Sequence, residues 1–243
     1  MPHLDTPTLL DQVGTIKPLG LDRGLARWRE RLPGLVWNDA SLEGNPVTLP
    51  EVVTLLDAGS IRGHKESDTT QILDLSRAAE LVEQTALTGF IQVSDQLSST
   101  LNALIAAHEI IEPGVVRGEG LVQGETVVAV MGVYFVATPG GPDLRRAFTQ
   151  SMDLVNSLPH PLAQATGWAA LAAYHQFYAN GNKRTARYLM NTILLSHGFD
   201  AIVTPAALRE PYNQALKTMY VTGDATGYAQ FLAGLYDDGH VTG

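Results

Sequence analysis

The chain has 243 residues, of which 45% are hydrophobic, enough to bury a substantial core in one domain with or without an appendage. Its formal net charge of -9 and its isoelectric point near 5.1 argue against nucleic acid as a partner, because binding a phosphate backbone requires a basic face. The absence of cysteine excludes disulfide bonds, a thiol nucleophile and a zinc-thiolate site, and is compatible with a reducing compartment.

The N-terminal sequence, Met-Pro-His-Leu-Asp, has no basic segment that leads into an apolar stretch, so we expect no targeting signal here. No later stretch approaches the length that spans a bilayer. We therefore expect a cytoplasmic protein without membrane contact. The sequence leaves the oligomeric state open.

Helix signals dominate the first half of the chain. Thr48 and Glu51 form a capping box that opens a short helix, and Gly59 follows its end. A longer helix is expected over 68–87, where apolar residues recur on one stripe. Ser94 is expected to cap the next helix.

The segment 120–138 differs from its surroundings. It is rich in Val, Tyr and Phe and has glycines at 124 and 132, which predicts a β-hairpin. From these residues alone, the hairpin need do no more than pack against the helices.

The rest of the chain again predicts helices, so the fold class is mainly α. We find no internal repeat and no low-complexity segment. One expected helix is opened by Pro142, and two more cover 163–177 and 183–197. Another is opened by Thr204 and Pro205, and a last one runs through Phe231 and Leu235.

The run from His175 to Arg187 has the composition of a phosphate-binding site. Gly181 and Asn182 predict a tight turn at the start of a helix, whose free N–H groups and positive dipole end attract an anion. Arg184 and Arg187 are three residues apart, so both guanidinium groups lie beside that anion. His175, upstream, could accept a proton from a hydroxyl group.

This run resembles the signature of the Fic family: His, any residue, Phe, any, Asp or Glu, Gly, Asn, Gly or Lys, Arg, two of any kind, Arg. Counting backward from Arg184, the histidine of the signature falls on Gln176. Either the loop is one residue longer, which keeps the His-x-Phe spacing of His175 and Phe177, or glutamine replaces the histidine. Asn180 stands where the family usually has a carboxylate.

The resemblance covers about residues 95–240 and implies a mainly α, Fic-type helical domain with a hairpin called the flap. The preceding residues, 1–94, are expected to form an N-terminal helical region. In the family, the flap adds the backbone of the target protein as an extra strand. The flap residues expected here are Val133, Tyr134 and Phe135.

The resemblance also implies an activity: transfer of AMP from ATP to a Ser, Thr or Tyr hydroxyl of a target protein that the sequence does not identify. His175 would be the general base. Mg²⁺ would accompany ATP, and Asn180 could offer it a carbonyl oxygen but no charge. The expected nucleotide-binding residues are Gly181, Asn182, Lys183, Arg184 and Arg187.

Two other functions stay open. Lys183 is found at this position in the death-on-curing toxins of the same superfamily, which act as kinases, although those toxins generally lack the second arginine that is present here. The shifted His175 and the neutral Asn180 would also suit a nucleotide-binding module without turnover.

The segment 36–46 resembles the inhibitory-helix motif of Fic proteins, in which Ser or Thr is followed by three residues, Glu, and Gly or Asn. Here Asp39 takes the Ser or Thr position and Glu43 is the glutamate. The resemblance implies that Glu43 pairs with Arg187 and blocks the site of the terminal phosphate. Taken alone, Glu43 would be a surface carboxylate before a C-capping glycine.

Overall fold

The computed structural model describes residues 1–122 and 125–237, which form the mainly α fold with a β-hairpin that the sequence predicts. None of the helices in these residues has both the length and the hydropathy of a membrane span. Two expectations fall partly outside the described residues: Gly124 of the hairpin and residues 238–240 of the domain. The elements are α1 (Thr6–Val13), α2 (Leu21–Leu42), α3 (Leu49–Ala58), α4 (Glu66–Ala86), α5 (Asp95–Ile105), β1 (Val127–Val130), β2 (Val133–Val136), α6 (Pro142–Asn156), α7 (Pro161–His175), α8 (Asn182–Ser196), the 3-10 helix η1 (Ala206–Leu208), α9 (Arg209–Thr222) and α10 (Thr226–Asp237).

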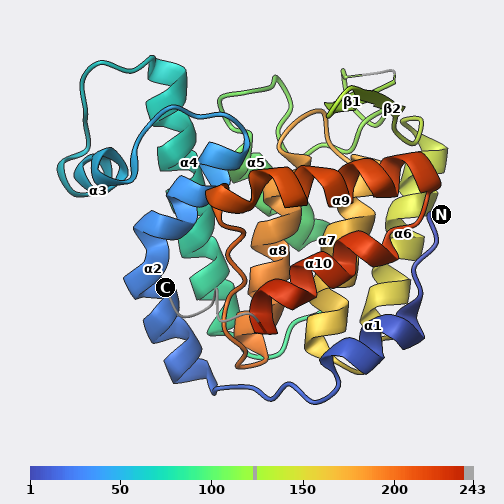
Figure 1. The fold of residues 1–243 in the computed structure, drawn as a ribbon. Helices are drawn as coiled ribbons and strands as arrows, with labels where there is room; N and C mark the ends of the chain where they lie inside the picture. The colour runs from blue at the N-terminus through green and yellow to red at the C-terminus, as the bar shows by residue number, and fades with distance from the viewer. Residues whose placement is uncertain (123–124, 238–243) are drawn as a thin grey trace.

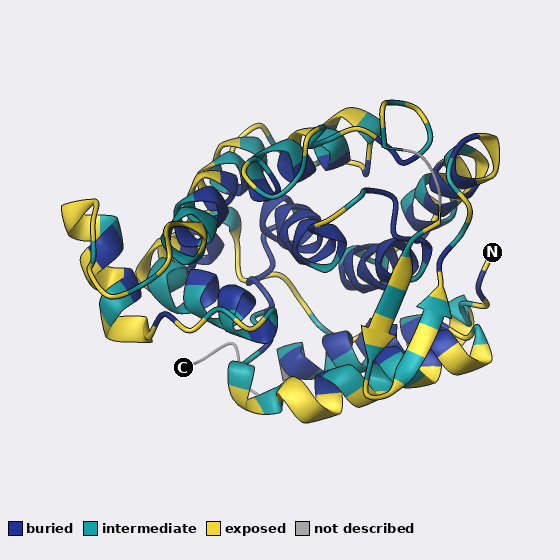
Figure 2. Ribbon diagram, turned by 90° about the horizontal axis from the view of Figure 1, so that it is seen from above, coloured by how far each residue is buried: buried dark blue, intermediate teal, exposed yellow. Residues whose placement is uncertain are grey.

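Helices α7 and α8 pack against each other at the centre of the fold, where both are mostly buried (Figures 1 and 2). Helix α7 is rich in Ala and Leu on all sides, as expected of a helix without a solvent face. Helix α8 is far more polar, yet every residue over 184–196 is buried. Its polar side chains therefore require partners from the surrounding helices.

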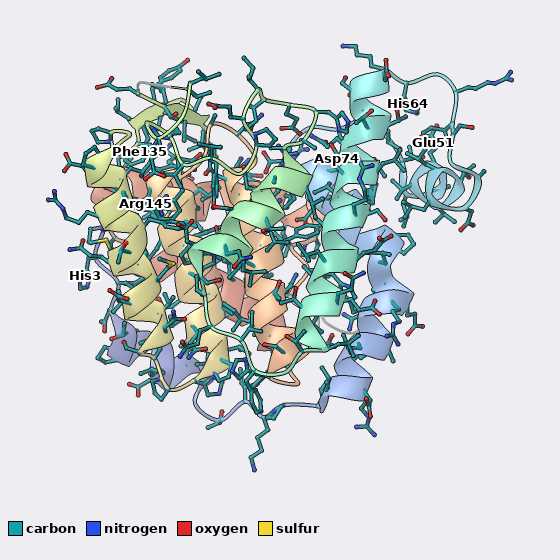
Figure 3. All side chains as sticks on the ribbon, turned by 180° about the vertical axis from the view of Figure 1, so that it is seen from behind. His3, Glu51, His64, Asp74, Phe135 and Arg145 are labelled. Carbon is teal, nitrogen blue, oxygen red and sulfur yellow. The ribbon has the colours of Figure 1, made fainter. Side chains whose placement is uncertain are left out.

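The other helices surround this pair. Helices α6 and α10 pack on α7, while α4 and α5 pack on α8, and α2 lies against α4 and α8. Helix α3 stands apart at the edge of the molecule and contacts α2 and α4 (Figure 1). Figure 3 shows Glu51 of α3, and His64 from the segment that follows α3, on the opposite side of the molecule from Phe135 of β2. The hairpin and α3 therefore occupy opposite sides of the fold.

Several predicted boundaries are confirmed, but the bounds of the first two helices were not predicted within the helical region expected over 1–94. The capping box of Thr48 and Glu51 is formed, and Gly59 ends α3 in the left-handed conformation. Helix α1 and most of α2 were not predicted. Pro33 lies inside α2 and disfavours a continuous helix, but Trp28 and Leu35 on either side of it are buried in the core.

The β-hairpin has the two-residue turn typical of such hairpins. Its strands are antiparallel, and Val130 pairs with Val133 across the turn of Met131 and Gly132. Both turn residues have positive φ, 44° and 79°, which matches the right-handed twist of the strands. The hairpin is shorter than the predicted segment 120–138, because the residues described before Val127 form turns and coil.

The buried Arg117 fastens the hairpin to the connection between α7 and α8. Its Nε donates to the carbonyl of Gln176 at 2.7 Å, and its Nη2 donates to the carbonyls of Thr138 at 2.8 Å and His175 at 3.1 Å. Burial lowers the pKa of Arg117. The side chain thus satisfies carbonyls from two segments that are far apart in sequence.

Replacing Arg117 with methionine should lower the free energy of unfolding by about 3 kcal/mol, because these buried carbonyls lose a charged donor. Urea unfolding monitored by circular dichroism measures the change. The matched control is Arg146→Met, at an exposed arginine of α6 that pairs with Asp143, where a change within about 0.5 kcal/mol is expected. Equal losses in the two variants would contradict the role given to Arg117.

Candidate active site

The candidate site lies where α7 ends and α8 begins, beneath the hairpin and beside α9 (Figure 1). Gly181 precedes α8 with φ of 74°, and a Cβ there would lie 3.2 Å from the side chain of Asn102. Asn182 closes the loop, since its side chain accepts from the backbone N–H of Tyr178 at 2.8 Å and donates to its carbonyl at 2.7 Å. The first turn of α8 is therefore held in one position.

Arg187 is buried on α8 and has partners from α2 and α9. Its Nε donates to Oδ1 of Asp39 at 2.5 Å, and its Nη1 donates to the hydroxyl of Tyr212 at 2.7 Å. Glu43 lies farther away, with Oε1 at 3.7 Å from Nη2. Burial alone would lower the pKa of Arg187, but the carboxylate of Asp39 raises it well above its ordinary value.

The other two cations of the turn are also paired. Lys183 contacts Glu43, with 3.0 Å between Nζ and Oε2. Arg184 holds Glu109 with both terminal nitrogens, at 2.5 Å and 2.6 Å. Glu109 comes from the segment after α5 and was not predicted as a site residue.

The charges of these residues balance. Lys183, Arg184 and Arg187 face three carboxylates, those of Asp39, Glu43 and Glu109. Burial opposes the ionisation of Glu43, but the cations outweigh it and lower its pKa; the same holds for Glu109, where Arg184 is the main partner. An anion entering the turn must share these cations with the carboxylates or displace them.

His175 is the last residue of α7, and its ring faces away from these ion pairs. Its Nδ1 lies 2.7 Å from the hydroxyl of Thr138, and its ring stacks on Phe177. Its Nε2 is buried and has no hydrogen-bond partner among the described residues. The ring borders a cavity of about 380 Å³, which Thr138 and residues of α6 also line. Burial lowers the pKa of His175 to about 4, so the imidazole is neutral at pH 7.

Gln176 faces the other way, toward α9. It adopts the left-handed conformation with φ of 55°, and its Nε2 lies 2.5 Å from the carbonyl of Ala173 and 3.5 Å from the hydroxyl of Tyr220. Arg187 also has its partner Tyr212 on α9. The structure thus directs Gln176 toward the helix that contacts Arg187, and His175 toward α6. The choice between them as the base stays a prediction.

Asn180 is exposed at the edge of the turn. Its side-chain nitrogen donates to Glu109 at 2.8 Å, and its oxygen accepts from the N–H of Gly181 at 2.7 Å. The oxygen that we expected to face a cation is therefore turned toward the backbone, and the nearest carboxylate is that of Glu109. Within the described residues, no three His, Cys, Asp or Glu side chains are grouped to hold a metal ion.

The flap residues divide between the site and solvent. Phe135 packs on α9, stacked on Tyr220 with 4.5 Å between ring centroids, and also contacts Tyr174. Tyr134 is 77% exposed, and Val133 is half-buried. Phe135 and Tyr134 therefore point to different surroundings, the first to α9 and the second to solvent.

The chain is similar in sequence to curated proteins. The protein adenylyltransferase Fic of Drosophila grimshawi is 26% identical over 204 residues, which cover 82% of this chain and 40% of the relative. The chain thus spans about 40% of the length of the relative it matches. No protein-family model matches the chain.

Solved structures show the same fold. A Fic-domain signalling protein from Bacteroides thetaiotaomicron superposes with a TM-score of 0.73 at 20% identity, covering 95% of this chain and 92% of the other. Fic-1 from C. elegans gives a TM-score of 0.70 at 19% identity, covering 96% and 68%. These superpositions cover nearly all of this chain.

The ion pair of Glu109 with Arg184 should make stability depend on pH. The pKa of Glu109 is lower in the folded protein than its ordinary value of 4.5, so the unfolded chain binds the proton more readily. The stabilisation is present above about pH 4.5 and is lost as the pH falls through the folded pKa.

Urea unfolding between about pH 6 and pH 3 measures this dependence. We expect Glu109→Gln to lose less stability over that range than the unaltered protein. The control is Glu80→Gln, at an exposed residue of α4. Identical pH dependence of the unaltered protein and Glu109→Gln would show that the pair does not form.

Proposed function

Since the chain carries a Fic domain, we propose that it transfers AMP from ATP to a hydroxyl group of a target protein. The observation that carries the proposal is the first turn of α8, where a rigid Gly181-Asn182 turn precedes three cationic side chains. Free N–H groups and cations at a helix start form an anion site. The name of the curated relatives, protein adenylyltransferase, supports the same reaction.

The proposed binding mode follows the resemblance. Arg184 contacts the inner phosphates of ATP and Arg187 the terminal phosphate, while the N–H groups at the start of α8 donate to the phosphate oxygens. The adjacent flap orients the target backbone. When ATP binds, Arg184 must exchange Glu109 for a phosphate, and Glu43 must leave the neighbourhood of Arg187.

The chemistry requires one proton acceptor. The hydroxyl oxygen of the target attacks the α phosphorus, the bond to the β phosphate oxygen breaks, and pyrophosphate leaves. In our proposal, Nε2 of His175 accepts the hydroxyl proton. The lack of a hydrogen-bond partner for Nε2 among the described residues supports this role, because a neutral ring leaves this nitrogen able to accept a proton.

Mg²⁺ is the expected companion of ATP, and its chemistry would be to offset the charge of the phosphates. The residues present fit an ion held mostly by phosphates and water. The carboxylate of Glu109 accepts a hydrogen bond from Asn180, and Asn180 itself is neutral. Of the protein's own residues, Glu109 is therefore the best candidate to contact the ion.

The test is incubation with ATP labelled at the α or the γ phosphate, followed by detection of label on protein. We expect label from the α phosphate, and a loss of about 10²- to 10⁴-fold in transfer rate for His175→Ala with nucleotide binding retained. Gln176→Ala is the matched variant and should retain transfer. Label from the γ phosphate alone would replace this proposal with phosphoryl transfer, the reaction that Lys183 suggested.

A second candidate function is nucleotide binding without turnover, and the directions of the Gln176 and His175 side chains favour it. Gln176 faces α9, whereas His175 faces Thr138 and α6. If Gln176 occupies the base position, the site binds nucleotide without turnover, because an amide does not accept a proton at neutral pH. ATP binding in calorimetry, without label on protein from either phosphate, would establish this alternative.

Glu43 is proposed as an inhibitor of the same site. It follows the last residue of α2 and contacts Lys183 at 3.0 Å, while its distance to Arg187 is 3.7 Å. In this position its carboxylate competes with the terminal phosphate for both cations.

Glu43→Gly should therefore raise transfer above that of the unaltered protein, measured as α-phosphate label on protein. The matched variant is Glu43→Gln, which removes the charge but keeps the side-chain size and should also raise transfer. The increase should disappear when Arg187→Ala is added. Folded Glu43→Gly protein with unchanged labelling would leave Glu43 as an ordinary carboxylate.

A further inference from the structure

Arg187 is held by two carboxylates that differ in how firmly they bind it. Asp39 makes a direct hydrogen bond of 2.5 Å to Nε, whereas Glu43 approaches Nη2 only to 3.7 Å. Asp39 is also the more buried of the two, with 8% of its side chain exposed against 19%. Asp39 is therefore the main partner of the arginine.

The two carboxylates also differ in how they can be released. Glu43 is the C-cap of α2 and precedes Gly44, so a movement of this end of the helix can carry Glu43 away from Arg187. Asp39 lies inside α2, which packs on α4 and α8. Moving Asp39 away from Arg187 requires moving the helix. The pair of Asp39 and Arg187 thus persists after Glu43 has left.

The two terminal nitrogens of Arg187 are the hydrogen-bond donors that an anion could contact. Nη1 donates to Tyr212, and Nη2 has no hydrogen-bond partner among the described residues. One donor is therefore directed toward the position of Glu43, while another donor of the same guanidinium, Nε, is already bonded to Asp39. A terminal phosphate at this position would gain a hydrogen bond and would lie close to a buried carboxylate.

We propose that Asp39 is a specificity-determining residue that cancels the terminal-phosphate subsite at Arg187, so that the site binds a nucleoside diphosphate about as tightly as a triphosphate. The inference rests on the proposed binding of nucleotide at α8. It does not depend on transfer. The uncharged Ser or Thr that the Fic inhibitory motif has at this position would leave the arginine charge to the phosphate.

The experiment compares ATP and ADP by isothermal titration calorimetry, in the presence of Mg²⁺. Glu43→Gly is used as the background, so that the removable carboxylate does not mask the subsite. The test variant adds Asp39→Asn, which keeps the size of the side chain and removes its charge. The matched control adds Asp200→Asn, since Asp200 is also a buried aspartate paired with an arginine, Arg31 at 2.6 Å, after the other end of α8.

In the background variant and in the control, the two dissociation constants should agree within about threefold. In the Asp39→Asn variant, ATP should bind at least about tenfold more tightly than ADP, because the charge of Arg187 is then no longer offset by Asp39 and can act on the terminal phosphate. ATP should also raise the melting temperature of this variant more than ADP does.

An equal affinity for ATP and ADP in folded Asp39→Asn protein would overturn the inference, and so would a tenfold preference for ATP in the background variant. If Asp39→Asn does not fold, Asp39→Ser is measured instead with the same expectations. Absence of nucleotide binding in all variants overturns the inference as well. Binding with the expected ratios but without labelling of protein would contradict only the proposed transfer.

Discussion

The fold depends on burying a polar helix at its centre. Helix α8 carries two buried arginines and a half-buried lysine within its first two turns, and a charge removed from water is stable only beside an opposite charge. Asp39, Glu43 and Glu109 meet this requirement from α2 and from the segment after α5. The same ion pairs therefore join distant parts of the chain and fill the place where an anion would bind. Stability and binding use the same side chains.

Another buried cation, Arg117, links the hairpin to the end of α7. Arg117 binds the carbonyls of His175 and Gln176, and also that of Thr138, which contacts the ring of His175. The backbone of the two candidate bases is thus held by one guanidinium, and their side chains diverge to opposite sides. The alignment of the signature with His175 or with Gln176 therefore decides which of the two side chains is the base. With His175 the proposed function is a transferase, and with Gln176 it is a binding module.

Much of this arrangement could be predicted from local signals. The capping box at Thr48, the left-handed turn at Gly59 and the positive dipole end of α8 follow from short-range chemistry. Helix α2 could not be predicted in full, because Pro33 opposes it locally and packing of the core restores it. Glu109 carries no sequence signal either, since its role depends on the fold bringing it to Arg184. The direction of His175 follows from the contact with Thr138, 37 residues away.

The charge balance at α8 has a consequence for the rate at which an anion reaches the site. Nucleotides carry several negative charges, and the chain has a formal net charge of -9, so the long-range field of the protein opposes their approach. Cations already neutralised by carboxylates do not attract the ligand from a distance. A nucleotide therefore reaches the start of α8 by diffusion without electrostatic attraction, and then replaces carboxylates in the ion pairs of the site. Added salt, which slows electrostatically steered association, should here weaken the repulsion and leave the approach unhindered.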